Sequence, residues 1–309
     1  MAIRLFIDGA AGTTGLEIRE RLAGRSEFEL LVLDDAQRKD EAARRDALRA
    51  ADIAILCLPD EAAKEAVKFA EGSGTRIIDA SSAHRVAHGW AYGFPELVGH
   101  ETIANAQLVS NPGCYPTGFL AAVAPLVRAG LLPADWPYTV NAVSGYSGGG
   151  HALIERFEAD PTIALRAYGL SLGHKHLPEM QTYAGLRHAP VFSPAVVPAH
   201  RGMVVDVPLA LCAMPSPPDA ATLRTALAAH FDGNTVVAVD RAELPAAELL
   251  LRADAAPWDG MRLYVFGSED GTQARLVAVL DNLGKGASGA AIQNLNLMCG
   301  LPETTGLRL

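Results

Sequence analysis

Short apolar runs alternate with segments of helical periodicity in the first third of the chain. The apolar runs predict buried strands at Ile3–Asp8, Phe28–Leu33, Ile53–Leu58 and Arg76–Asp79. The segments between them predict helices, which we place at Gly15–Ala23, Asp40–Ala50 and Glu61–Glu71. Apolar strands separated by helices are typical of a parallel sheet covered on both faces. We therefore expect an α/β fold with a Rossmann-type, doubly wound parallel sheet.

The pattern changes after about residue 135, where strands alternate more clearly and fewer helices separate them. The predicted strands are Tyr138–Ser144, Val191–Val197, Met203–Leu211, Thr235–Val239, Met261–Phe266 and Arg275–Leu280. This pattern of strands with few intervening helices indicates a second, mixed α+β domain. We place the boundary between the two domains near residue 113. A last helix, which we expect to be amphipathic, follows a glycine-rich turn at roughly Ala287–Cys299.

Composition narrows the possible partners. Of 309 residues, 50% are hydrophobic and 20% are charged, which excludes an intrinsically disordered chain. The net charge of −9 disfavours nucleic acid and anionic membranes as partners. Pro125 and Arg128 interrupt the longest apolar stretch, so no membrane span is expected. The four cysteines lie far apart in the sequence, so neither a disulfide framework nor a zinc site is expected. Residues 1–8 become acidic too early for a signal peptide. We expect a cytoplasmic protein with reduced thiols.

A glycine-rich loop with GxxGxxG spacing joins the first predicted strand to the first predicted helix. Glycines permit a tight turn there, and the backbone N–H groups and the helix N-terminus can then bind a pyrophosphate. An ordinary strand-to-helix turn is the alternative. The residues expected to contact the cofactor are Gly9, Ala11, Gly12, Thr13, Thr14 and Gly15.

The loop after the second strand bears on which dinucleotide binds. Asp34 and Asp35 could hold a ribose diol and would repel a 2′-phosphate, whereas Arg38 and Lys39 would attract that phosphate. The sequence favours NADP(H) over NAD.

Cys114 lies in the run Asn111-Pro112-Gly113-Cys114-Tyr115-Pro116-Thr117, which opens another predicted helix. A cysteine at a helix N-terminus is favoured as thiolate, and its polar and glycine flanks are unlike a core pattern. We therefore interpret Cys114 as a nucleophile. Cys57, Cys212 and Cys299 lie in apolar segments and are interpreted as structural.

A thiol nucleophile needs a partner for proton transfer. His174 and His176, with one residue between them, are expected to point the same way from an extended segment, and Glu179 could offer a carboxylate to an imidazole. We prefer His176 as the acid/base. Two surface histidines or a metal site are the alternatives, but no third metal ligand stands at a typical spacing, so no metal is expected.

Several segments at strand ends could bind anions through hydroxyl, backbone N–H or guanidinium groups. Together they suggest a substrate with two or more anionic groups. The candidates are Ser81, Arg85, Ser144, Ser147, Gly148 and Arg201.

These motifs together resemble the N-acetyl-γ-glutamyl-phosphate reductase family, in particular its shorter form. The Pro-Gly-Cys-Tyr-Pro-Thr run at Cys114 and the His-x-His-x-Pro-Glu run at His174 are the specific parts, and the match extends over essentially the whole chain. Further matching segments are 9–15, 79–85, 92–96, 144–150 and 281–289.

The resemblance implies NADPH-dependent reductive dephosphorylation of N-acetyl-γ-glutamyl phosphate to N-acetylglutamate 5-semialdehyde, a step of arginine biosynthesis. By similarity, Cys114 is the nucleophile, His174 or His176 the acid/base, and Arg85 and Ser147 contact phosphate. Asn282 and the glycine-rich stretch with Gly286 lie near the nicotinamide.

The resemblance also implies that the last helix packs back on the cofactor domain. That domain would then comprise 1–113 and 287–309, with 114–286 as the catalytic domain, and the chain would form a dimer or tetramer.

Other interpretations of the function stay open. A related semialdehyde dehydrogenase would act on aspartyl or N-acetyl-aminoadipyl phosphate. The N-acetyl-aminoadipyl substrate is one methylene longer, and one methylene changes the binding free energy in a pocket by only about 1 to 3 kcal/mol, so the sequence leaves this substrate open. A non-catalytic nucleotide-sensing protein or a cysteine hydrolase would belong to other classes.

Overall fold

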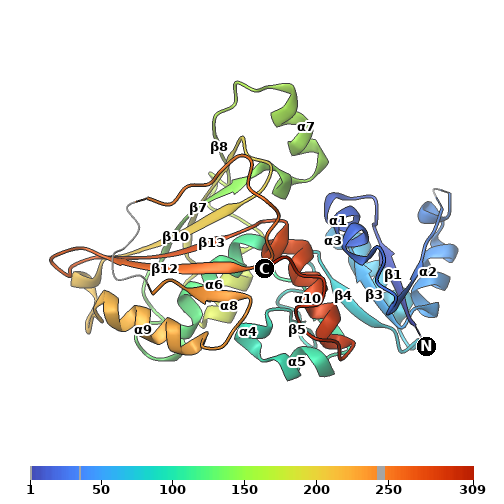
Figure 1. Cartoon of the computed structure of the whole chain (residues 1–309), viewed down its shortest axis with the longest axis horizontal. Coiled ribbons are helices and arrows are strands. Elements are labelled where there is room, and N and C mark those ends of the chain that lie inside the picture. Colours follow the sequence, from blue (N-terminus) through green and yellow to red (C-terminus); the bar gives the residue numbers. More distant parts are fainter. Residues whose placement is uncertain (1, 35, 242–247) are drawn as a thin grey trace. The chain divides into compact units, whose positions relative to one another are not determined.

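The computed structural model describes residues 2–34, 36–241 and 248–309. Two units divide the chain (Figure 1). Unit 1 contains residues 1–113 and 287–307, and unit 2 contains residues 114–286 and 308–309. The boundary at residue 113 precedes the change of pattern seen in the sequence near residue 135.

Unit 1 is built on a six-stranded sheet with the order β2-β1-β3-β4-β6-β5, and every neighbouring pair is parallel. The expected strands are confirmed, although the second and third end two residues earlier than predicted. Val32, 66% exposed, already lies in the loop that follows the second strand. The strands are β1 (Ile3–Asp8), β2 (Phe28–Leu31), β3 (Ile53–Leu56), β4 (Arg76–Asp79), β5 (Ala91–Tyr92) and β6 (Leu108–Ser110).

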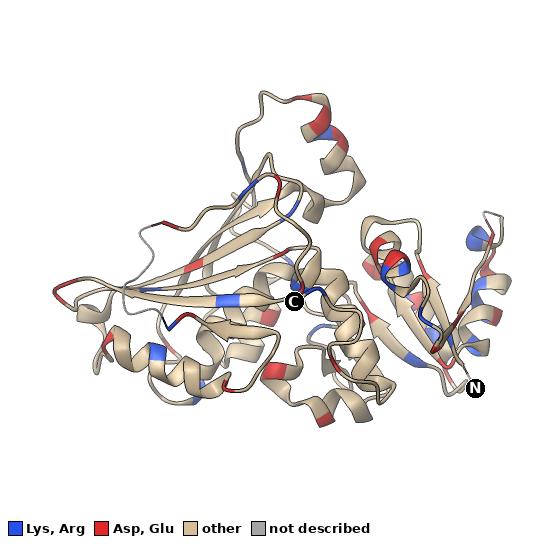
Figure 2. Cartoon of the chain, viewed as in Figure 1, with Lys and Arg blue, Asp and Glu red and all other residues tan. Residues whose placement is uncertain are grey.

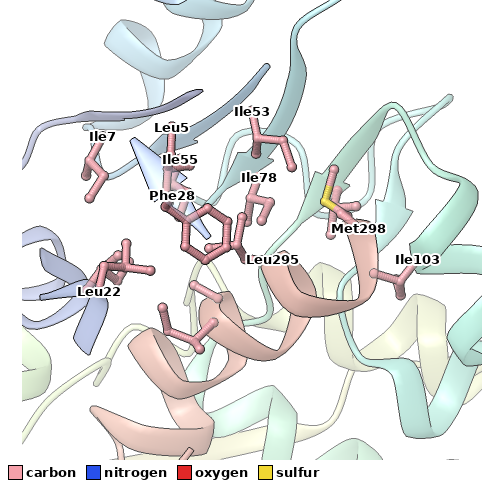
Figure 3. Close-up of a cluster of buried hydrophobic side chains, with 14 residues drawn as sticks. Leu5, Ile7, Leu22, Phe28, Ile53, Ile55, Ile78, Ile103, Leu295 and Met298 are labelled. Carbon is pink, nitrogen blue, oxygen red and sulfur yellow. The ribbon is translucent and has the colours of Figure 1, made fainter. Parts of the chain in front are cut away.

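Helices cover both faces of this sheet. Successive residues of a strand point to opposite faces, so the apolar strands place apolar side chains on both, and the helices bury them. Leu5 and Ile7 of β1 join the apolar cluster drawn in Figure 3, which includes side chains of α1 and α10. Phe6, between them, joins a second cluster with α2 and α3. The fold is therefore the doubly wound arrangement that the sequence predicted. The helices of unit 1 are α1 (Thr13–Leu22), η1 (Gln37–Lys39), α2 (Glu41–Ala50), α3 (Asp60–Ala70), α4 (Pro95–Val98), α5 (His100–Asn105) and α10 (Gly289–Met298).

Helix α10 is buried on all sides, so the expectation of an amphipathic helix is wrong. Its apolar residues Ile292, Leu295 and Met298 enter the cluster of Figure 3. Its polar residues are also buried and are hydrogen-bonded: Asn294 donates to the carbonyl of Gly93, and Asn296 to that of Glu303. Amides that donate hydrogen bonds within the core can occupy a buried position, whereas the sequence pattern assigned these side chains to solvent.

Unit 2 contains a seven-stranded mixed sheet with the order β11-β12-β13-β10-β7-β9-β8. The pairs β11–β12 and β7–β9 are parallel and the other pairs are antiparallel. The strands are β7 (Thr139–Gly145), β8 (Arg166–Ala167), β9 (Val191–Val197), β10 (Met203–Leu209), β11 (Val237–Val239), β12 (Met261–Gly267) and β13 (Ala274–Leu280).

One face of this sheet is buried, because the residues of β9 and β10 alternate between buried and more exposed positions. Helix α6 (Cys114–Arg128) packs against β10 and β13 and is buried along most of its length. The other helices of unit 2 are η2 (Tyr146–Gly149), α7 (His151–Ala159), α8 (Leu177–Ala184), η3 (Leu211–Ala213) and α9 (Ala220–His230). The π-helical segment η4 (Gly284–Ser288) begins in unit 2, and its last two residues belong to unit 1. Within the described ranges, no helix combines the length and the hydrophobicity needed to cross a membrane.

Candidate active site

The glycine loop of unit 1 needs glycine at two positions. Gly9 has a φ of +84°, and a Cβ there would lie 2.3 Å from the carbonyl oxygen of Cys57. A Cβ on Gly15 would lie 2.5 Å from the carbonyl oxygen of Gly9. The hydroxyl of Thr13, the first residue of α1, is buried and has no hydrogen-bond partner among the described residues. A tight loop, a helix N-terminus and this hydroxyl fit the pyrophosphate of a dinucleotide.

A pocket of about 570 Å³ lies beside the loop within unit 1. Gly9, Ala11, Arg38 and Lys39, all expected from the sequence to contact the cofactor, line it. Arg19 and Arg44 also line it, and the sequence analysis missed both because they stand on helices α1 and α2 rather than in a motif. Figure 2 shows the basic residues on η1 and the mixed charges on α2.

Asp34 has a structural role in the loop after β2. Its Oδ1 accepts hydrogen bonds from the backbone N–H groups of Ala36 and Gln37, at 2.9 and 2.8 Å. This turn leads into η1, which presents Arg38 and Lys39. Asp35 lies outside the described residues. Asp34 thus stabilises this turn through one of its two carboxylate oxygens.

Asp79 organises the segment that follows β4. This fully buried carboxylate accepts hydrogen bonds from the Ser81 hydroxyl at 2.7 Å and lies 2.6 Å from Nδ1 of His84. The His84 ring stacks on Trp90 with a centroid distance of 4.2 Å. The buried Arg85 donates through Nε to the carbonyl of Asn111. Ser81 and Arg85, both expected to bind anions or cofactor, therefore also hold this loop in place.

In unit 2, Cys114 is the first residue of α6, the position that the sequence predicted. Gly286 of η4 lies directly against it, since a Cβ on Gly286 would come within 2.9 Å of the Cys114 Cβ. A helix N-terminus favours the thiolate form of a cysteine, and the missing side chain at Gly286 lets the π-helical segment lie close to Cys114.

An aromatic cluster surrounds the residue after the cysteine. The Tyr115 ring lies 5.8 Å from the His176 ring and 5.1 Å from the Phe192 ring, and its hydroxyl accepts a hydrogen bond from the Tyr168 hydroxyl at 3.3 Å. Burial raises the pKa of Tyr115 and of Tyr168, and the nearby Cys114 adds to both shifts. The two phenols therefore stay neutral and polar beside the thiol. Sequence analysis missed Tyr115, Tyr168 and Phe192 as members of this site.

His174 and His176 lie together, with ring centroids 4.6 Å apart. The expected extended segment is wrong: His176 has helical backbone angles (φ −87°, ψ −13°) and directly precedes α8. Nδ1 of His174 accepts a hydrogen bond from the backbone N–H of His176 at 3.2 Å. His174 thus holds the backbone of His176, which is 5% exposed, and Glu179 is buried in the first turn of α8. The described residues contain no cluster of three or more side chains that could hold a metal ion.

Asn282 connects the segment that follows β7 to the residue that precedes β10. Its Nδ2 donates to the Ser147 hydroxyl at 2.9 Å, and its Oδ1 accepts from the backbone N–H of Gly202 at 2.9 Å. A Cβ on Gly148 would lie 3.3 Å from this Nδ2, so η2 passes close to the amide. Ser144 donates its hydroxyl to the carbonyl of Gly145.

Arg201 forms an ion pair with Asp281, with 2.9 Å between Nη1 and Oδ2. The same Oδ2 accepts a hydrogen bond from the backbone N–H of Trp258. The structure thus brings Ser147, Gly148, Arg201 and Asn282 together in unit 2.

Family models match both units. Residues 114–282 match the semialdehyde dehydrogenase dimerisation domain, and residues 34–106 match the semialdehyde dehydrogenase NAD binding domain. The N-acetyl-gamma-glutamyl-phosphate reductase of Brucella ovis is 53% identical to the chain over 311 residues, covering 97% of this chain and 100% of the relative. The chain belongs to the N-acetyl-γ-glutamyl-phosphate reductase family. Both the family and the oxidoreductase class expected from the sequence motifs are thereby confirmed.

Solved structures of aspartate semialdehyde dehydrogenases share the fold of this reductase family member. The enzyme II of Vibrio cholerae, complexed with ASA, superimposes with a TM-score of 0.71 at 18% identity, covering 97% of this chain and 99% of the other. The Candida albicans enzyme with NADP gives a TM-score of 0.65 at 14% identity, covering 97% and 99%. At these identities the likeness shows the fold alone.

Proposed function

We propose that the chain catalyses the NADPH-dependent reductive dephosphorylation of N-acetyl-γ-glutamyl phosphate to N-acetylglutamate 5-semialdehyde. The observation that carries the proposal is Cys114 at the start of α6, beside Gly286 and a cluster that contains His176. A relative of that name is 53% identical over almost the whole chain, which supports the choice of substrate.

Cys114 is the nucleophile in this proposal. Its thiolate attacks the acyl carbon of the substrate, the carbon–oxygen bond to phosphate breaks, and inorganic phosphate leaves a thioester on Sγ. Backbone N–H groups at the start of α6 stabilise the oxyanion that forms during the attack. One such donor typically lowers the activation free energy by about 3 to 4 kcal/mol. The nicotinamide cofactor supplies, when bound, the hydride that converts the thioester to a thiohemiacetal.

His176 is the acid/base. As a protonated imidazole it donates a proton to the thiohemiacetal oxygen, and as a neutral imidazole it removes that proton when the carbon–sulfur bond breaks and the aldehyde leaves. His174 is a positioning residue, because its Nδ1 accepts the backbone N–H of His176. Glu179, buried in the first turn of α8, is the carboxylate proposed to accept a hydrogen bond from an imidazole of this pair.

The anionic groups of the substrate are assigned to unit 2. Ser147, Gly148 and Arg201 lie around Asn282 and offer a hydroxyl, a backbone N–H and a guanidinium. Arg85 of unit 1 and Ser144 remain further phosphate candidates. Asn282 and Gly286, expected near the nicotinamide, also hold η2 and η4 in position.

NADP(H) is the proposed cofactor rather than NAD. The glycine loop holds the pyrophosphate, and Arg38 and Lys39 line the pocket in which a 2′-phosphate would sit. Asp34, which would have favoured a ribose diol, stabilises its turn through one of its two carboxylate oxygens.

The reverse reaction tests this function, because it avoids the unstable acyl phosphate. Protein, N-acetylglutamate semialdehyde, phosphate and NADP⁺ are mixed, and nicotinamide absorbance is followed. Aspartate semialdehyde and the aminoadipate homologue are the parallel substrates. We expect NADP⁺ reduction that requires phosphate and is fastest with the acetylated glutamyl aldehyde.

Each other result points to a different function. A preference for aspartate semialdehyde or for the longer homologue would overturn the substrate assignment. Cofactor binding without turnover of any aldehyde would indicate a nucleotide-sensing protein. Hydrolysis of an activated ester at full rate without nicotinamide would indicate a cysteine hydrolase.

A homo-oligomer formed through unit 2 completes the proposal. The matching family model is named for dimerisation, and one face of the seven-stranded sheet is only partly buried within the chain. Light scattering after size exclusion should give a mass of at least twice 32.5 kDa. A monomer at micromolar concentration would contradict it.

A further inference from the structure

The cofactor pocket of unit 1 contains an acidic side chain, whose negative charge would repel a phosphate ligand unless a neighbouring cation neutralised it. Asp8 is the last residue of β1, directly before Gly9, and is 5% exposed. Among the described residues that line this pocket, it is the only acid, whereas Arg19, Arg38, Lys39 and Arg44 are bases. The carboxylate therefore stands in the same pocket as the residues proposed to hold the 2′-phosphate.

Arg44 neutralises this carboxylate. From the first turns of α2, its Nη2 donates to Oδ2 of Asp8 at 2.9 Å, and its Nε lies 3.2 and 3.3 Å from the two carboxylate oxygens. A two-pronged arginine–carboxylate contact of this kind is strong and directional. The contact with Asp8 raises the pKa of Arg44, so the guanidinium remains charged. Phe69, whose ring centroid lies 6.0 Å from the guanidinium carbon, packs beside the pair.

We propose that Arg44 is a specificity-determining residue: by neutralising Asp8, it leaves the pocket with the surplus positive charge of Arg19, Arg38 and Lys39 that a 2′-phosphate requires. This inference rests on the proposed use of NADP(H). A phosphate monoester carries about −1.5 to −2 charges at neutral pH, so it responds strongly to one carboxylate nearby. The ribose hydroxyl of NAD, at the same place, carries no charge.

The test compares the dissociation constants of NADP⁺ and NAD⁺, which differ only in the 2′-phosphate, by isothermal titration calorimetry. The variants are Arg44→Gln, Asp8→Asn and the double variant. Arg45→Gln is the matched control, because Arg45 is the next residue of α2, is exposed, pairs with Glu41 and does not line the pocket.

We expect Arg44→Gln to weaken NADP⁺ binding about 10-fold more than NAD⁺ binding, since it leaves the Asp8 charge uncompensated. The double variant, which removes both charges, should restore the ratio of the two constants to within about 3-fold of the unmodified protein. Arg45→Gln should leave the ratio unchanged.

An unchanged ratio in Arg44→Gln, or no recovery in the double variant, would overturn the inference. If Arg44→Gln does not fold, the Asp8→Asn variant decides the question alone. This substitution leaves the charge of Arg44 uncompensated and should increase the preference for NADP⁺ over NAD⁺. An unchanged preference would overturn the inference. Tighter binding of NAD⁺ than of NADP⁺ by the unmodified protein would instead refute the proposed cofactor.

Discussion

Cys114 differs from Cys57 and Cys299 in its surroundings. It begins a helix, whereas burial raises the pKa of the Cys57 thiol to about 12 and that of the Cys299 thiol to about 11. We expect Cys114→Ser to bind NADP⁺ normally but to lose turnover by about 10³-fold or more, because an alcohol is a much poorer nucleophile than a thiolate. Steady-state kinetics with calorimetric cofactor binding measure this. Activity within 10-fold of the unmodified enzyme would contradict the mechanism.

The two histidines are expected to differ in their contribution to rate. His176→Asn should lower kcat by about 10²- to 10⁴-fold and remove the limb of the pH–rate profile that reports the imidazole. His174→Asn keeps an oxygen that can accept the backbone N–H of His176, so it should cost less than about 10-fold and keep that limb. Loss of the limb in His174→Asn, with retention in His176→Asn, would reverse the assignment.

Sequence alone predicted candidate residues whose signal is local. Cys114 and the histidine pair could be proposed because their flanks and spacing are visible within a few positions. Tyr168 and Phe192 were missed because they meet Tyr115 through tertiary packing, across sequence separations of 53 residues and more. Arg44 escaped notice because its role depends on a contact with Asp8, 36 residues away.

At the scale of elements, the π-helical segment η4 lies directly against Cys114, the proposed nucleophile. A Cβ on Gly286 would lie 2.9 Å from the Cys114 Cβ and 3.1 Å from the carbonyl oxygen of Asp281. Gly286→Ala should therefore displace η4 or Cys114, cost about 1 to 3 kcal/mol of stability, and slow alkylation of Cys114 by iodoacetamide. Peptide mass spectrometry at timed intervals measures the alkylation. An unchanged rate would show that the close approach has no part in exposing the thiol.

Helix α10 stabilises unit 1 from within its core. Leu295 is fully buried in the cluster of Figure 3, between α10 and the sheet. Leu295→Ala should lower the free energy of unfolding by about 2 to 5 kcal/mol, because it leaves a cavity among packed side chains. Urea unfolding measures this loss. A loss below 1 kcal/mol would mean that α10 adds little to the stability of unit 1.

At the scale of the whole molecule, sequence predicted the first sheet better than the second. Apolar strands alternating with helices have one common solution, the parallel sheet of unit 1. Alternation in unit 2 identified strands but not their neighbours: β7 pairs with β9 in parallel and with β10 antiparallel. Strand pairing depends on contacts between distant segments, which the alternation along one strand does not report.

The buried thiols link the stability of the whole chain to alkaline pH. Cys57 and Cys299 have pKa values raised from 9.0 to about 12 and about 11, so between pH 9 and 11 the folded chain keeps protons that the unfolded chain loses. A state that binds more protons is disfavoured as pH rises, so stability should fall over this range, by at most about 1.4 kcal/mol per pH unit for each thiol. Urea unfolding at pH 8, 9, 10 and 10.5 measures the slope. The Cys57→Ala/Cys299→Ala double variant should fall less steeply, whatever its stability at pH 8, and equal slopes would place the alkaline sensitivity elsewhere, for example in the buried tyrosines.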